Sequence, residues 1–191
     1  MLGEIKYTDI DKSKGIDLAY IKIDDQMLPH LNNPYKFLTI DKISKHNRML
    51  DGMNYCVLGF PEKNIKIEDG HMETGASIYL TCATNEKPYK YYNLDRDIFF
   101  LVEMKGKGTD VKSGKNTKID TNFYGISGGG LWFLTYNFDP NIKVYSIDYK
   151  LIGIMTEFKK GKFFCLIANK AHLFIDAFSI IEGFKFRQKA K

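Results

Sequence analysis

The sequence predicts a mostly β protein with one helix near its C-terminal end. Tyrosine, phenylalanine and glycine are abundant, with 12 Tyr, 14 Phe and 16 Gly in 191 residues, and this composition is typical of strands and turns. Short apolar runs recur along the chain and are bounded by Gly, Asn, Asp or Lys. Only one segment carries apolar residues at convincing helical spacing. We therefore expect an antiparallel barrel or sandwich on which a terminal helix docks.

The first expected strand is residues 16–23, which end at the turn-forming pair Asp24 and Asp25. An irregular polar connector with two prolines follows, so a domain boundary is expected within residues 30–50. Further strands are predicted at residues 53–60, 76–83, 98–104, 130–136, 144–147, 151–156 and 163–167. Beyond them Asn169 can cap a helix whose apolar face includes Phe174, Ile175, Phe178 and Ile181.

The amino-acid composition indicates which binding partners and which cellular compartment to expect. The net charge of +5 comes largely from lysines in the loop of residues 105–118 and in the C-terminal tail. No aromatic residue is interleaved with the loop lysines, which favours a solvated surface over a nucleic-acid site. The odd set of cysteines, Cys56, Cys82 and Cys165, lacks metal-ligand spacing and is expected to consist of buried free thiols. With no signal peptide and no membrane-spanning run at hand, we expect a cytoplasmic protein without a membrane partner, a metal or a cofactor.

The most informative stretch is the serine-glycine motif of residues 124–132, in which Ser127 lies inside a run of glycines. A serine hydroxyl becomes a good nucleophile when it is held exposed beside a base, with N–H donors placed for the developing oxyanion. Glycines permit the unusual backbone conformations that such a turn needs. A glycine-rich β turn with an incidental serine is the alternative, and the motif alone favours neither interpretation.

Two nucleophile motifs fit this stretch, G-x-S-G-G of trypsin-like peptidases and G-x-S-x-G of α/β-hydrolases. In the hydrolases the serine turn leads from a strand into a helix, and an aspartate and a histidine follow it, an order that Asp148 and His172 supply. Residues 130–136, however, are aromatic and β-prone, which makes them a poor helix. The trypsin-like alternative is therefore favoured.

Other segments also resemble the trypsin-like (chymotrypsin-fold) serine peptidases, of bacterial type. Residues 17–23 are similar to the strand that carries the catalytic aspartate of the family, and residues 151–156 resemble the strand after the nucleophile. The resemblance implies a chymotrypsin-like double β-barrel that is N-terminally incomplete. Residues 1–35 would be the remnant of the first barrel, residues 36–168 the second barrel, and residues 169–191 the C-terminal helix and basic tail.

The same resemblance assigns roles to single residues. Ser127 would be the nucleophile, and Asp17 would orient a histidine and stabilise its charged form. The backbone N–H groups of Gly125 and Ser127 would form the oxyanion hole. The residues implied to bind substrate are Thr121 near the base of the specificity pocket, and Thr156, Glu157 and Phe158 along the edge that pairs with an extended peptide.

The catalytic histidine, which precedes the aspartate in this family, is missing before Asp17. The four histidines are His30, His46, His71 and His172, and each is expected to be a surface or packing residue. We therefore expect a serine endopeptidase that is inactive or nearly so as this chain stands, with a polypeptide substrate. The alternative is a non-catalytic peptidase-like module that binds a peptide or protein partner. Exposed strand edges of an open first barrel would favour oligomers in both cases.

Overall fold

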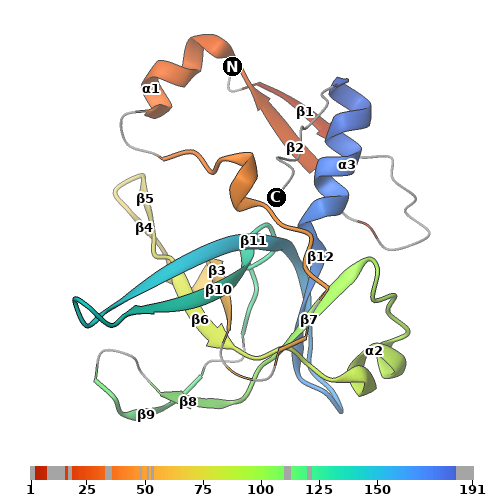
Figure 1. Ribbon diagram of the computed structural model, residues 1–191. Coiled ribbons are helices and arrows are strands. Elements are labelled where there is room, and N and C mark those ends of the chain that lie inside the picture. Colours follow the sequence, from red (N-terminus) through yellow and green to blue (C-terminus); the bar gives the residue numbers. More distant parts are fainter. Residues whose placement is uncertain are drawn as a thin grey trace.

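The structure is a computed structural model, and it describes residues 3–7, 16, 19–32, 36–47, 49–50, 52, 54–109, 113–119 and 122–183. Its main body is a six-stranded antiparallel sheet with the strand order β6-β3-β10-β11-β12-β7 (Figure 1). The strands are β3 (Tyr55–Gly59), β6 (Ser77–Thr81), β7 (Phe99–Glu103), β10 (Gly130–Asp139), β11 (Val144–Lys159) and β12 (Cys165–Lys170). Among the described residues, strands clearly outnumber helices, which confirms the mostly β prediction.

The sheet is curled, and its two edge strands meet at one end. Ala83, just beyond β6, forms an antiparallel bridge with Val102 in β7. The Glu103 N–H donates to the Cys82 carbonyl oxygen at 2.9 Å, so polar edge groups are satisfied there. The buried interior is formed by Tyr55, Val57, Phe100, Val102, Met104, Phe123, Ile126, Leu131, Ile152, Met155, Leu166 and Ala168. The chymotrypsin-like double barrel itself stays a prediction.

Strand β12 begins with consecutive apolar residues instead of alternating apolar and polar ones, because it is buried on both faces. All six of its residues are buried. Leu166 and Ala168 face the interior of the curled sheet, whereas Cys165 and Ile167 pack in a second cluster with Tyr89. Burial raises the pKa of the Cys165 thiol to about 11, which keeps it protonated. All three cysteines are free as predicted, although Cys82 is only half-buried.

The N-terminal hairpin lies beside the C-terminal helix (Figure 1). It consists of β1 (Gly3–Tyr7) and β2 (Ala19–Ile23), paired antiparallel. The Tyr20 ring meets Phe174 and Phe178 of α3 (Ala171–Glu182) at centroid distances of 6.0 and 5.1 Å, both edge-on. Aromatic contacts of this kind attach the two chain ends to each other. No helix within the described ranges is long and apolar enough to cross a membrane.

Two predicted boundaries were wrong. The strands expected at 144–147 and 151–156 form one long strand, β11, because its first half pairs with β10 without interruption. Asn169 does not cap the terminal helix; it is fully buried in β12 and pairs with Phe99. The N-cap is Lys170, which makes no side-chain capping bond. The helix itself is confirmed.

Several elements were not predicted from the sequence. The hairpin of β4 (Ile65–Glu68) and β5 (His71–Thr74) is exposed along its length, although Ile65 and Ile67 alternate with charged residues in β4. β8 (Lys107–Thr109) and β9 (Asn116–Lys118) form a second short hairpin inside the lysine-rich loop. The remaining short elements are α1 (Leu28–Asn32), α2 (Glu86–Tyr92), η2 (Asp25–Met27), η3 (Ile40–Lys42) and η4 (Glu62–Asn64).

Candidate nucleophile turn around Ser127

Ser127 is exposed in a double turn that connects the buried Phe123 to β10. The Ile126 N–H donates to the Phe123 carbonyl oxygen at 3.1 Å, and the Gly129 N–H donates to the Ile126 carbonyl oxygen at 2.9 Å. Ile126 is 1% exposed and belongs to the main core, so it anchors the turn from below. The Ser127 hydroxyl makes no hydrogen bond within the described part of the chain. It is therefore held on a fixed backbone and is accessible to a reactant.

The glycines of the motif are needed for different reasons. Gly125 and Gly128 both have φ of +82°, in the left-handed region that L side chains rarely adopt. A Cβ at Gly125 would also stand 2.7 Å from the Glu62 backbone nitrogen, whereas one at Gly128 would meet nothing within 4 Å. A Cβ on Gly129 would come within 2.6 Å of the Leu58 carbonyl oxygen. The expectation that glycines permit an unusual backbone around the serine is confirmed.

Backbone hydrogen bonds clamp the turn between two other segments. The Gly128 N–H donates to the Met155 carbonyl oxygen, and the Met155 N–H donates to the Gly129 carbonyl oxygen, each at 2.8 Å. On the other side the Glu62 N–H donates to the Tyr124 carbonyl oxygen at 2.8 Å. Because these bonds join residues far apart in sequence, the turn is fixed by strand β11 and by Glu62 as well as by its own hydrogen bonds.

The two N–H groups assigned to the oxyanion hole, those of Gly125 and Ser127, take no part in a hydrogen bond between described residues. Their neighbours behave differently, since the N–H groups of Ile126, Gly128 and Gly129 are all used. Unused N–H donors on either side of a rigid residue are available to an anionic or carbonyl oxygen. The turn can therefore donate two backbone hydrogen bonds to a bound oxygen atom.

The predicted peptide-binding edge lies on β11 next to the clamp. Thr156 is the extra residue of a β-bulge, and its Oγ1 donates to the Ile167 carbonyl oxygen at 3.3 Å. Glu157 forms an ion pair of 2.7 Å with Lys159, as a solvent-facing glutamate does. The Phe158 ring packs edge-on against Tyr124 at 5.5 Å, so this position does lie beside the serine turn. Asp17 and Thr121 lie outside the described residues.

None of the four histidines is hydrogen-bonded to Ser127 in the described part of the chain. His30 and His71 are exposed. His46 stacks 4.3 Å from the Phe133 ring, and its Nε2 is 3.1 Å from the Tyr55 hydroxyl. Burial, reinforced by the charges of Lys45 and Lys170, lowers the pKa of His172, and its Nδ1 is buried without a partner among the described residues. The expectation of surface and packing histidines agrees with these environments.

The α/β-hydrolase alternative does not fit the structure. Its serine turn must enter a helix, but Ser127 is followed by strand β10. Asp148, which would supply its acid, pairs instead with Lys42 at 2.6 Å. This pair lowers the pKa of Asp148 and raises that of Lys42. Asp148 is therefore engaged in a surface ion pair.

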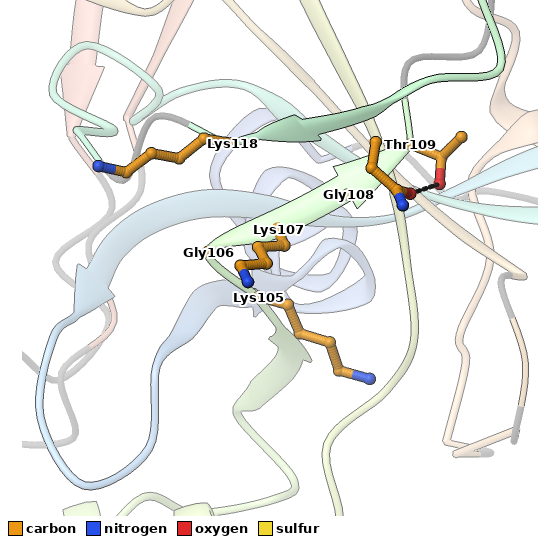
Figure 2. A pocket seen from close by; sticks show the side chains of 7 residues that line it. Lys105, Gly106, Lys107, Gly108, Thr109 and Lys118 are labelled. Atoms are coloured by element: carbon orange, nitrogen blue, oxygen red, sulfur yellow. Dashed lines mark hydrogen bonds between the residues drawn. The ribbon is translucent and has the colours of Figure 1, made fainter.

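A second feature is an open cavity of 960 Å³ at the β8–β9 hairpin (Figure 2). It is lined by Lys105, Gly106, Lys107, Gly108, Thr109, Asn116 and Lys118, and so by no carboxylate among the described residues. Lys107 and Lys118 stand directly opposite each other in the register. Like charges directly opposite each other on paired strands are destabilising.

Replacing Lys107 with glutamate should therefore stabilise the protein by roughly 0.2–1 kcal/mol at low salt, because a repulsive cross-strand pair becomes an attractive one. The free energy of unfolding in urea measures the effect. Lys66→Glu is the matched control, since Lys66 already faces Glu73 across the exposed β4–β5 hairpin and its reversal should destabilise. A loss of stability in Lys107→Glu would contradict the repulsion.

Comparison of the chain with protein-family models, with curated proteins and with solved structures finds no match. The resemblance to trypsin-like peptidases rests on the residues themselves. Within the described ranges, no three His, Cys, Asp or Glu side chains are grouped so that they could hold a metal ion.

Proposed function

We propose that this chain is the serine-bearing part of a trypsin-like endopeptidase that hydrolyses peptide bonds through an acyl-enzyme on Ser127. The observation that carries the proposal is the turn itself. An exposed serine sits on a clamped backbone, and the N–H groups of Gly125 and Ser127 are unused within the described residues. Preorganised donors at the position of a developing oxyanion are commonly the largest single contribution to acyl-transfer catalysis.

In the proposed reaction the Ser127 oxygen attacks the carbonyl carbon of an extended peptide that pairs along residues 156–158. The oxyanion accepts hydrogen bonds from the N–H groups of Gly125 and Ser127. The serine proton passes to a histidine, which Asp17 would orient. None of the four histidines of this chain is proposed for that role, so the base would come from another polypeptide segment. Without it the serine stays protonated and reacts slowly.

The second candidate is a non-catalytic module that binds peptide along the same edge. The specific observation in its favour is that Ser127 has no hydrogen-bonded base within the described part of the chain. Such a module would keep the β11 edge and the aromatic contact of Phe158 with Tyr124, which do not depend on the reactivity of a serine.

A fluorophosphonate probe with added imidazole tests the proposal. The probe phosphonylates an activated serine and releases fluoride, and imidazole can accept the proton that a missing histidine would take. We expect slow labelling of Ser127 that accelerates with imidazole concentration and disappears in Ser127→Ala. Ser146→Ala is the control, because Ser146 is equally exposed but bonds the Asn137 carbonyl oxygen on a plain hairpin.

The outcomes separate the two candidates. Labelling that is unaffected by imidazole, or that is spread over several serines, would contradict an activated Ser127. If the probe does not react and an extended peptide still binds equally to the wild type and to Ser127→Ala, the non-catalytic module is supported instead. Mass spectrometry of the labelled peptide locates the modified residue in each case.

A further inference from the structure

Strands β10 and β11 continue beyond the sheet as a two-stranded arm, defined here as residues 135–149 (Figure 1). β3 pairs with β10 only as far as Phe133, and β12 pairs with β11 only from Gly153 onward. Within the described residues no other strand pairs with either edge of the arm. A two-stranded ribbon of this kind is marginally stable in water without further packing.

The arm has one apolar and one polar face because its side chains alternate. On one face Phe138 stands opposite Tyr145, and Tyr136 stands opposite Ile147. Tyr149 extends the same face toward the base of the arm, as the two-residue period requires. On the other face the opposed pairs are Asn137 with Ser146 and Thr135 with Asp148.

The apolar face is exposed to an unusual degree. The exposed fractions are 51% for Phe138, 70% for Tyr145, 57% for Ile147 and 45% for Tyr149. With roughly 200 Å² for a large side chain, these four present about 450 Å² of mostly apolar surface, more than half of the roughly 800 Å² that each partner contributes to a standard interface. This is the size of the largest apolar patch on a typical monomer, and such a patch is often functional.

The charges identify the partner that fits. The face has no charged side chain of its own, and the Lys42 ammonium that lies 4.9 Å from the Tyr149 ring centroid is paired with Asp148. A highly acidic partner therefore gains little there, although the chain has a net charge of +5. Each end of the arm carries both signs, with Asp139 and Lys143 at the tip and the ion pair of Asp148 with Lys42 at the base. Two arms packed antiparallel would therefore bring apolar face to apolar face and oppose no block of like charge.

We propose that the partner is a second copy of this chain, and that the two arms pack their apolar faces together in a two-fold symmetric dimer. A two-fold interface uses the same patch on both subunits, which suits a face of uncharged aromatic and aliphatic residues. Tyr145 and Phe138, whose rings lie 4.8 Å apart near the tip, form an aromatic anchor of this interface on each subunit. The proposal is independent of any reaction at Ser127.

Molar mass from sedimentation equilibrium, over a wide range of concentration, tests the dimer. The wild type should have twice the mass of one chain at high concentration. Tyr145→Lys should raise the dissociation constant at least about tenfold, because an aromatic anchor is lost and a charge is placed on the apolar face. Ser146→Lys adds the same charge to the adjacent residue on the opposite face and should leave the mass unchanged.

The single tryptophan gives a second readout, since Trp132 contacts Tyr149 at the base of the arm with a centroid distance of 5.8 Å. Its emission should shift with dilution in the wild type and in Ser146→Lys. Circular dichroism verifies folding, and Tyr145→Ser replaces the lysine variant if that one fails to fold. A wild type that is monomeric at every concentration overturns the proposal. A dimer that Tyr145 substitutions leave intact, or that Ser146→Lys weakens equally, also overturns it.

Discussion

Gly125→Ala should lower the free energy of unfolding by about 2–6 kcal/mol, because two separate penalties coincide at this position. The alanine must adopt a φ of +82°, and its Cβ must also stand 2.7 Å from the backbone nitrogen of Glu62. Backbone atoms of η4 cannot move aside as a flexible side chain can. Urea unfolding of the variant measures the loss.

Gly128→Ala is the matched control, since Gly128 has the same φ of +82° but open space around its Cβ position. Gly128→Ala should lower the free energy of unfolding by only about 1–2 kcal/mol, the cost of placing an alanine in the left-handed backbone region. Equal losses in the two variants would contradict the steric contact. Labelling of Ser127 by the fluorophosphonate should fall in Gly125→Ala as well, because the shifted backbone carries one of the two oxyanion donors.

Phe123→Ala should destabilise the protein by about 3–5 kcal/mol, the cost of emptying an aromatic site in a closed core. Phe123 is 1% exposed, and its ring lies between those of Tyr79 and Phe158 at centroid distances of 5.3 and 5.9 Å. Phe60→Ala removes an aromatic ring that is 50% exposed and should cost far less.

A second readout connects this core position to the candidate site. The Phe123 carbonyl oxygen accepts the first hydrogen bond of the serine turn, and the ring supports Phe158 beside it. Serine labelling should therefore drop further than the fraction of unfolded protein explains. A Phe123→Ala variant with wild-type stability would mean that the ring is not part of the packed interior.

The core strands were predictable because they are buried on both faces. Residues 99–102 of β7 and 165–168 of β12 are unbroken apolar runs, and the structure buries all of them. The β4–β5 hairpin could not be found in this way, since all of its residues are exposed. The β8–β9 hairpin has only three residues in each strand. The sequence predicted two strands, at 144–147 and 151–156, because polar residues around Asp148 interrupt the apolar residues. In the structure Asp148 belongs to the exposed arm, where a strand can continue without buried side chains.

The candidate site was predictable to the extent that it is local. The positive φ of Gly125 and Gly128 follows from a serine held in a tight glycine turn. The need for Gly129 does not, because its neighbour is the carbonyl oxygen of Leu58, on a strand far away in the sequence. The clamp to Met155 was equally invisible, since a backbone hydrogen bond leaves no residue signature.

The pairing of β7 with β12 has a consequence for the time course of folding. Leu101 and Val102 are completely buried in the finished sheet, but their partner strand is synthesised about 60 residues later. At 5–20 residues per second, this part of the nascent chain waits about 3–12 s before its partner exists. Long-range antiparallel pairing also slows folding itself. During that interval an apolar strand is available to other chains, so the yield of folded protein should depend on the rate of synthesis and on chaperones that shield β7.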